Sequence, residues 1–458
     1  MILDEVFDRF ATDSPVCVML RATLANVFAE DRLNAIFDEN AQRQRQSELM
    51  FSTVADIMGA VVCRIRPSVN AAYEAKMDDM SVTVKAVYDK LRRTEPAVVR
   101  GLVTETANHI GTIIKQMKAT VPPLLPGYRV KIVDGNHLRR TDRRIGELRE
   151  MNVAPLPGKA LAILDPSLRL VIDVVPCEDG HAQERSLFPE LKEIIERRDV
   201  FIADRNFCTK DFLSAFFSRN AHFIIRQHGS LHGDLSGRRR RVGAIETGVV
   251  YEQTMCICDQ DGNARTLRRI TVKLNEPTRD GDSEIHILTN LPKRIGALKI
   301  AKLYADRWTI ETAFQEMAEN LRGEIKTLGY PKAALFGFCM ALVSYNVLSV
   351  VKAAIRSAHG ADRADNLSTY YMADEIAGTY RGMMIVLEPA YWTERFAELT
   401  PSQMAKALTR IAKTIPQPKY RKHKWSPKKK KKKAKVTRRK HVSTQRILDQ
   451  RKTNKQAA

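Results

Sequence analysis

The order of apolar segments between residues 128 and 227 restricts the fold of this chain more than any other feature. Alternating apolar and polar residues predict strands, and stretches with apolar residues every three or four positions predict helices. The segments are, in order, strands at 128–136, 159–165 and 168–176, a helix at 182–198, a strand at 200–204, a helix at 209–220 and a strand at 221–227. This order predicts an α/β fold in which two parallel strands join three antiparallel strands through helical crossovers.

Positive charge is concentrated in the C-terminal part of the sequence. The net charge is +22, but residues 419–458 hold 18 Lys and Arg against one acid, whereas the other 418 residues carry 57 Lys and Arg against 52 Asp and Glu. The run Lys428–Lys433 cannot bury apolar surface, so this tail is predicted to be disordered. Such a polycation attracts phosphate backbones through counterion release, which favours nucleic acid as the partner over a solubility tail or a membrane-surface tether.

The same patterns divide the whole chain into parts. Between residues 128 and 227, the order of strands and helices is that of a ribonuclease H-like mixed sheet flanked by helices. The other segments predict an all-helical N-terminal domain, a β-rich insertion and a disordered basic tail. The predicted parts are a helical domain at 1–121 that is expected to bind DNA, the first part of the core at 128–227, the insertion at 228–295, core helices at 296–360, a C-terminal helical region at 361–418 and the polybasic tail at 419–458.

Three features bear on the cellular compartment. Acidic residues interrupt the N-terminus, so no secretory signal peptide is predicted. The seven cysteines are scattered and odd in number, as expected in a reducing compartment. The uncharged stretch 333–351 is just long enough to span a membrane, but it contains Tyr345 and Asn346 and is predicted to be a buried core helix. We expect a cytoplasmic, nucleoid-associated protein without a membrane partner.

Carboxylates stand where two neighbouring strands of the predicted sheet end. The first strand ends at Asp134-Gly135, and the fourth ends at Asp204. A third carboxylate would come from a helix packed on the sheet, and Glu311 is the candidate. Three carboxylates can hold two Mg²⁺ or Mn²⁺ ions, which activate a nucleophile and stabilise the leaving oxygen in phosphoryl transfer. Each could also be an ordinary turn or surface residue, and three other aspartates lie near strand ends: Asp165, Asp173 and Asp179.

The stretch "YADRWTIETAFQEM" at 304–317 reads as an amphipathic helix with Tyr304, Arg307 and Glu311 on one face. Together with "IVDGNHL" and "DRNF" around the two aspartates, it makes residues 128–350 resemble the DDE transposases of the insertion-sequence-4 type. The third motif of that family is Tyr-x2-Arg-x3-Glu-x6-Lys, and its second aspartate is usually followed by x-Gly-aromatic. Here Ala318 stands in place of the lysine and Asn206 in place of the glycine.

The resemblance implies metal-dependent cleavage and joining of DNA strands at transposon ends. Asp134, Asp204 and Glu311 would be the catalytic residues and the ligands of two Mg²⁺ or Mn²⁺ ions. Tyr304 and Arg307 would contact DNA near the scissile phosphate. The partners would be the inverted repeats at the transposon ends and the target DNA, and the active complex would be a homodimer because two ends must be handled together.

Two alternatives remain open. A metal-dependent nuclease of the same fold would cut DNA without joining it. A non-catalytic DNA-binding relic of a transposase would explain Asn206 and Ala318 as the result of decay.

Further basic residues are candidates for DNA contact. Arg322 lies four residues after Ala318 on the same helical stripe and is predicted to replace the family lysine as a phosphate contact. His137 follows the first aspartate closely enough to reach a phosphate, although such a histidine is more often only hydrogen-bonded. A run of four arginines near the start of the insertion suits phosphate contact but also fits a solvated turn. The run consists of Arg238, Arg239, Arg240 and Arg241.

Removing residues 419–458 is expected to weaken non-specific DNA binding and to flatten its dependence on salt. The reason is that the slope follows the number of phosphates neutralised, about 0.9 per contact on duplex DNA. Binding to a duplex oligonucleotide, titrated with salt, measures this slope, and cleavage of an already bound end should be retained. An unchanged slope would show that the tail serves something other than DNA.

Overall fold

The strands expected between residues 128 and 227 are present in the computed structural model, which describes residues 2–278, 281–416, 418–423 and 441–457. They are β1 (Arg129–His137), β3 (Lys159–Asp165), β4 (Leu170–Cys177), β5 (Asp199–Ala203) and β6 (His222–Arg226). Strand β3 pairs antiparallel with both β1 and β4, whereas β5 pairs parallel with β1 and with β6. The observed mixed sheet is consistent with the ribonuclease H-like core expected from the order of the segments.

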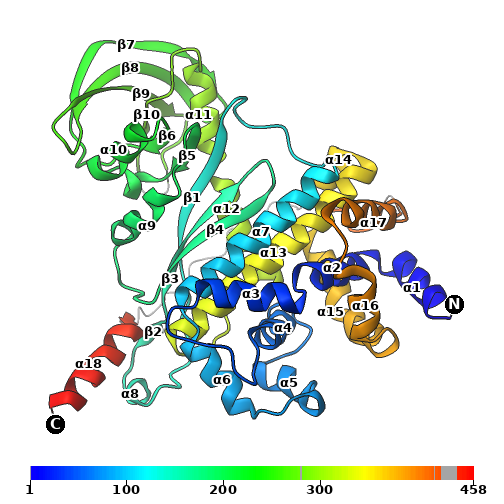
Figure 1. Ribbon diagram of the computed structural model, residues 1–458. Helices are drawn as coiled ribbons and strands as arrows, with labels where there is room; N and C mark the ends of the chain where they lie inside the picture. Colours follow the sequence, from blue (N-terminus) through cyan, green and yellow to red (C-terminus); the bar gives the residue numbers. More distant parts are fainter. Residues whose placement is uncertain (1, 279–280, 417, 424–440, 458) are drawn as a thin grey trace.

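The strands of the predicted insertion extend this sheet. They are β7 (Asp234–Ile245), β8 (Gly248–Cys258), β9 (Ala264–Leu274) and β10 (Glu284–Thr289). Because β10 pairs antiparallel with β6, the nine strands lie in the order β4-β3-β1-β5-β6-β10-β9-β8-β7. The insertion therefore extends the sheet beyond β6, whereas β1 is an interior strand of the sheet (Figure 1).

Strand β1 and its neighbour β5 are covered on both faces. Ile132, Val200 and Ile202 belong to one apolar core, whereas Val133 and Phe201 belong to a second. Since successive side chains of a strand point to opposite faces, this alternation places one core on each side of the sheet. Two short helices cover the second core with a cluster of phenylalanines, α9 (Phe188–Glu193) and α10 (Lys210–Ser218).

Two long helices cover the first core. Helix α7 (Pro96–Gln116) packs on β4, and α13 (Pro331–His359) packs on both α7 and β4. Among the described residues, α13 is the one helix long and apolar enough to cross a membrane by length and composition. However, 94% of its most apolar 18-residue window is buried inside the protein. This observation confirms the prediction that the stretch 333–351 is a buried core helix.

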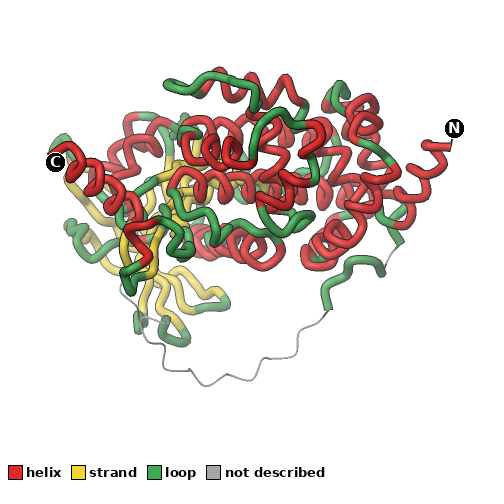
Figure 2. Tube along the Cα trace, turned by 90° about the horizontal axis from the view of Figure 1, so that it is seen from below, coloured by secondary structure: helices red, strands yellow, loops and turns green. Residues whose placement is uncertain are grey.

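Most of the remaining helices lie to one side of the strands (Figure 2). The N-terminal ones are α1 (Ile2–Asp13), α2 (Pro15–Val27), α3 (Glu30–Asn40), α4 (Phe51–Val62), α5 (Val69–Glu74) and α6 (Val84–Arg93). The later ones are α14 (Ala361–Asp365), α15 (Thr369–Val386), α16 (Pro389–Phe396) and α17 (Pro401–Lys413). The region predicted as helical at 1–121 is thus helical, and its apolar core is continuous with that of α13.

The structure differs from the predicted disorder in two parts of the tail. Near its start, Tyr420 is buried and its hydroxyl donates a hydrogen bond to Glu375. Near its end, β11 (His441–Ser443) pairs in parallel with β2 (Ala154–Leu156), and α18 (Thr444–Ala457) follows it. The physical reason is that backbone pairing and ion pairs with acidic groups of the core offset the repulsion among the basic residues of the tail. The lysine run lies outside the described residues.

A buried amide joins the N-terminal helices to the C-terminal ones. Asn26 on α2 donates hydrogen bonds to the carbonyl oxygens of Phe396, Ala397 and Leu399, at 2.8, 3.1 and 2.9 Å. Its own oxygen lies 2.7 Å from His109 Nε2 on α7. One side chain therefore satisfies three carbonyl groups at the C-terminal end of α16.

Replacing this amide is expected to destabilise the whole chain. Asn26→Ala leaves buried carbonyl groups without donors, which should lower the free energy of unfolding by about 1–3 kcal/mol. Urea denaturation measures the difference. Thr12→Ala is the matched control, because it removes an exposed hydroxyl bonded only to the Asp8 carbonyl and should change stability by less than about 0.5 kcal/mol. An equal effect of the two variants would contradict the role given to Asn26.

Candidate active site

The two candidate aspartates lie where β1 and β5 separate. The parallel pairing of these strands ends at Ile132 and Ile202, and each aspartate lies two residues further along its own strand or just beyond it. Asp134 does not end its strand as predicted, because β1 continues to His137 through its pairing with β3. The structure thus opens a gap on one side of β1 while the other side stays paired, and both aspartates border that gap.

The third carboxylate reaches the site from a helix that begins beside it. The stretch predicted as one helix is two, α11 (Ala297–Ala305) and α12 (Trp308–Asn320), which break around Asp306 and Arg307. Glu311 lies in the first turn of α12, where a negative charge is favoured by the helix dipole. Tyr304 ends up buried in the last turn of α11.

Arg307 connects the carboxylates. Its Nη1 atom lies 3.3 Å from Asp134 Oδ2 and 2.7 Å from Glu311 Oε1. Burial would lower the pKa of the Arg307 guanidinium, but the negative charges of Asp134, Glu311 and Asp204 raise it instead. Burial, helped by the negative charges of Asp204 and Glu311, raises the pKa of Asp134 to about 7 against the opposing effect of Arg307. The three carboxylates therefore act on one another, with one guanidinium compensating for their charge.

A divalent ion would suit the donor atoms of this site, since carboxylate oxygens are the ligands that Mg²⁺ and Mn²⁺ prefer. Among the residues that the structure describes, no group of three His, Cys, Asp or Glu side chains is arranged so that it could hold a metal ion. In the observed arrangement, the guanidinium of Arg307 contacts Asp134 and Glu311. The chemistry of the donors fits such ions, and the assignment of Asp134, Asp204 and Glu311 as ligands stays a prediction.

The sequence reading missed Glu184, which lies beside the site. Its Oε2 atom accepts a hydrogen bond of 3.1 Å from the side-chain amide of Asn206, and its Oε1 atom lies against Gly135. A Cβ atom at Gly135 would lie only 2.4 Å from that oxygen, so an alanine there would require the end of the Glu184 side chain to move. No motif in the sequence points to Glu184. Asn206, which stands in place of the family glycine, therefore has Glu184 as its hydrogen-bond partner.

The other predicted DNA contacts lie in different places. Arg322, beyond the end of α12, donates hydrogen bonds to the carbonyl groups of Arg66 and Pro67. His137 is exposed at the end of β1. The arginine run, residues 238–241, lies on β7 at the far edge of the sheet from β4, so the structure does not bring it to the carboxylates. Within the run, Arg239 pairs with Glu284 at 2.9 Å, and Arg240 pairs with Glu252 at 3.3 Å. Contact of these residues with DNA stays a prediction.

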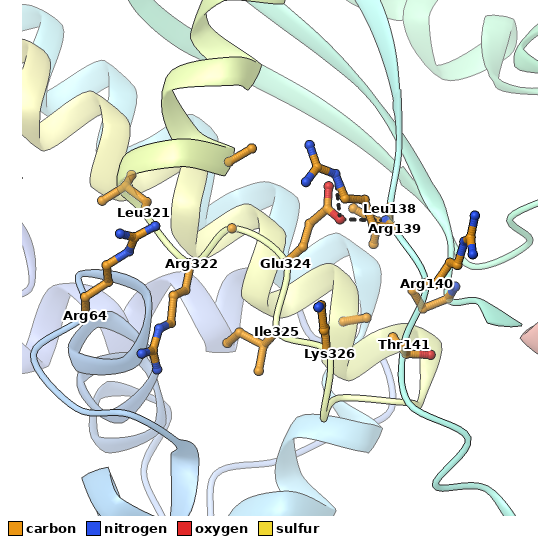
Figure 3. A pocket seen from close by; sticks show the side chains of 14 residues that line it. Arg64, Leu138, Arg139, Arg140, Thr141, Leu321, Arg322, Glu324, Ile325 and Lys326 are labelled. Atoms are coloured by element: carbon orange, nitrogen blue, oxygen red, sulfur yellow. Dashed lines mark hydrogen bonds and ion pairs between the residues drawn. The ribbon is translucent and has the colours of Figure 1, made fainter. Parts of the chain in front are cut away.

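A cavity of about 210 Å³ lies beyond the C-terminal end of α12 (Figure 3). Basic side chains from three parts of the chain line it, namely Arg64, Arg139, Arg140, Arg322 and Lys326. Ala318, which stands at the position of the family lysine, also lines it. Glu324 accepts a hydrogen bond of 2.7 Å from the backbone amide of Arg139. The cavity therefore has basic walls around the position where the family has a lysine, although Ala318 itself is neutral.

Comparisons with known proteins relate this chain to transposases. Residues 125–347, just under half of the sequence, match the family described as "Transposase DDE domain". "Putative transposase y4zB" of Sinorhizobium fredii (strain NBRC 101917 / NGR234) is 29% identical over 162 residues. That similarity covers 34% of this chain and 43% of the relative, so the chain spans less than half of the relative's length. The family match supports a DDE transposase domain in the central part of the chain, and the similarity to the relative is consistent with it.

The contact between Glu184 and Gly135 can be tested by a double-mutant cycle. Gly135→Ala should displace the end of the Glu184 side chain and break its bond to Asn206, costing about 0.5–1.5 kcal/mol of stability. In a Glu184→Ala background the same change should cost about 1 kcal/mol less, because the clash is gone. Urea denaturation of the four proteins gives the coupling. Gly146→Ala is the control, since a Cβ there meets nothing within 4 Å. An identical cost of Gly135→Ala in both backgrounds would contradict the contact.

Proposed function

We propose that this protein is a DNA transposase of the insertion-sequence-4 type that cuts and joins DNA strands at transposon ends. The observation that carries this proposal is the meeting of Asp134 and Glu311 on the guanidinium of Arg307, at the point where β1 and β5 separate. The match of residues 125–347 to the transposase DDE domain supports it. The family normally uses divalent metal ions, and two Mg²⁺ or Mn²⁺ ions are the proposed cofactors.

The roles of the residues follow from their positions. Asp134, Asp204 and Glu311 would be the metal ligands, and bound ions would activate the attacking oxygen and stabilise the leaving oxygen of a phosphodiester. Arg307 orients Asp134 and Glu311 through its two ion pairs and connects α12 with β1. The half-buried guanidinium, beside the buried Tyr304, would face a scissile phosphate with a positive charge.

The alternatives differ in what they require of the same residues. A nuclease of this fold would use the same carboxylates but would release the cut ends without joining them. For the relic, the bond from Asn206 to Glu184 is evidence against simple decay at that position, because the amide is held by a specific partner. Short terminal inverted repeats flanking the gene would favour the transposase over both alternatives.

The whole assembly is part of the proposal. The partners would be the inverted repeats at the transposon ends and the target DNA, which a homodimer would hold together. We place this complex in the cytoplasm, associated with the nucleoid. Arg322 remains the proposed substitute for the family lysine, since it lines the same cavity as Ala318 and lies partly buried there.

Removing any one of the three carboxylates should abolish chemistry while DNA binding persists. Asp134→Ala, Asp204→Ala and Glu311→Ala are each expected to lower Mg²⁺-dependent cleavage and strand transfer by about 100-fold or more, because each removes a proposed metal ligand. Affinity for DNA should hold, since it comes mainly from basic groups. Gel assays with a labelled transposon end measure cutting, joining and binding separately.

Glu319→Ala provides a control on the same helix, because that carboxylate is exposed two turns away and bonds to Gln315 at 2.8 Å. It should leave cleavage within about two-fold of the unchanged protein. Near-normal cleavage by any one of the three alanine variants would remove that residue from the proposed set. Cleavage without joined products in the unchanged protein would favour the nuclease.

A further inference from the structure

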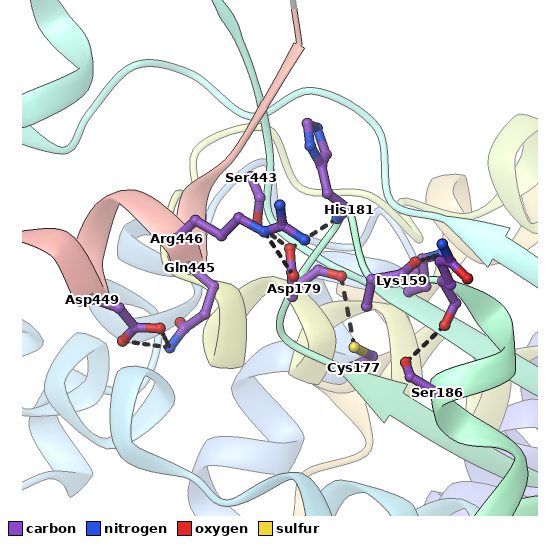
Figure 4. A network of polar contacts seen from close by, with 11 residues as sticks. Lys159, Cys177, Asp179, His181, Ser186, Ser443, Gln445, Arg446 and Asp449 are labelled. Carbon is purple, nitrogen blue, oxygen red and sulfur yellow. Dashed lines mark hydrogen bonds and ion pairs between the residues drawn. The ribbon is translucent and has the colours of Figure 1, made fainter.

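The end of the chain folds back onto the core beside the candidate active site. Strand β11 pairs with β2, and the carboxylate of Asp179 anchors the segment that follows (Figure 4). Its Oδ1 accepts a hydrogen bond of 2.5 Å from Ser443 Oγ, and its Oδ2 accepts one of 3.0 Å from Arg446 Nε. One turn further along α18, Arg451 pairs with Glu147 at 2.6 Å. Two acids of the core thus hold the segment 441–457 in place.

The docked segment contributes to the lining of a second, larger cavity of about 1080 Å³. His441 and Arg446 come from the segment, whereas Arg139, Arg140 and Lys326 come from other parts of the chain. Asp142 is the one acidic residue among those that line it. Two of the four arginine and lysine side chains on the walls are paired with acids, Arg446 with Asp179 and Arg139 with Glu324. Arg140 and Lys326 remain without an ion pair among the described residues.

The loop that carries two of these arginines is held rigidly by its backbone. The amide of Leu138 donates to the Gly158 carbonyl at 3.1 Å, and that of Thr141 donates to the Pro155 carbonyl at 3.1 Å. The amide of Asp142 donates to the Lys326 carbonyl at 2.7 Å. The side chain of Arg140 is exposed and has no hydrogen bond or ion pair with any residue that the structure describes. A fixed backbone with a free guanidinium is suited to bind an anion at low entropic cost.

The cavity lies a short distance along β1 from the candidate active site. His137 lines the cavity and lies three residues after Asp134 on the same strand. Three residues of an extended strand span about 10 Å. A DNA strand bound at the carboxylates would therefore have phosphates within reach of the basic walls.

We propose that the C-terminal segment 441–457 forms one wall of a basic groove that binds the phosphodiester backbone of DNA next to the active site. Docking through Asp179 and Glu147 holds the segment at the cavity that Arg140 and Lys326 also line, so that a bound backbone would run between the segment and these two cations. This inference rests on the proposed function, because it names where that DNA runs. It also gives the end of the chain a defined role, separate from the general attraction exerted by its lysines.

Substituting Asp179 or Glu147, the two acids that hold the segment 441–457, provides a test. A general charge effect and the loss of docking predict opposite changes in DNA affinity. Asp179→Ala and Glu147→Ala each raise the net charge of the protein, so a general field effect would tighten DNA binding. If docking builds the groove, the same variants should weaken binding of a duplex oligonucleotide, and we expect a loss of about three-fold or more. Asp449→Ala is the matched control, since it makes the same charge change on α18 at an exposed carboxylate that does not contact the core.

The salt dependence of binding tests the groove itself. Arg140→Ala and Lys326→Ala should each reduce the slope of binding against salt by about 0.9. Lys406→Ala, which removes an exposed charge on α17, is the control and should leave the slope within error of the full value. Hydrogen exchange of residues 441–457 in the Asp179→Ala/Glu147→Ala double variant reports whether the segment is released, which we expect.

The outcomes separate this inference from the proposed function. Tighter or unchanged binding after release of the segment overturns the groove, as does a slope in Arg140→Ala equal to that of the control. Continued protection of the segment in the double variant overturns the docking that the groove requires. If the unchanged protein cuts and joins transposon ends in any of these cases, the proposed function stands without the groove. An unchanged protein that does not bind DNA overturns both.

Discussion

Strand β1 is buried on both faces, and this double burial determines where the rest of the site can lie. A carboxylate on such a strand loses most of its contact with water, so its charge must be compensated by a partner that the fold brings to it. For Asp134 that partner is Arg307, and the same guanidinium also binds Glu311. The position of α12 is therefore coupled to β1 by electrostatics as well as by packing. The break between α11 and α12 places Arg307 at the N-terminal end of α12, where it reaches both carboxylates.

The distribution of charge follows a second constraint. Outside the tail the sequence is nearly neutral overall, yet five basic side chains line the cavity beyond α12. Many basic residues elsewhere are paired with acids, as in the pairs of Arg239 and Arg240 on β7. A basic side chain that already forms an ion pair binds a phosphate more weakly than one whose backbone is held in place and whose charged group has no partner. The loop around Arg140 belongs to the second kind, which is why it outweighs the more conspicuous arginine run as a candidate for DNA contact.

Much of the fold could be predicted from the sequence. Alternation, or for residues 200–204 a short and wholly apolar run, identified the five core strands because each strand is buried on at least one face. The uncharged stretch around Tyr345 was recognised as a core helix because its polar residues argue against a lipid environment. The errors were at junctions. Asp134 was expected at a strand end, but pairing with β3 extends β1 by three residues. The tail was expected to be disordered from its composition, which does not reveal that Arg446 meets Asp179, 267 positions earlier.

The sequence by itself determined the identity and spacing of the candidate carboxylates and of the tyrosine and arginine that accompany Glu311, because these depend on local periodicity and on residue type. Only the tertiary structure decided which side chains share the site. Glu184 belongs to no motif, and it lies beside Gly135 in a short 3₁₀ helix (Glu184–Leu187) that packs on the turn after β5. Arg64, Arg140 and Lys326 come together around one cavity from three separate segments. Contacts between residues far apart in a chain depend on how its segments pack, and periodicity along the chain contains no record of that packing.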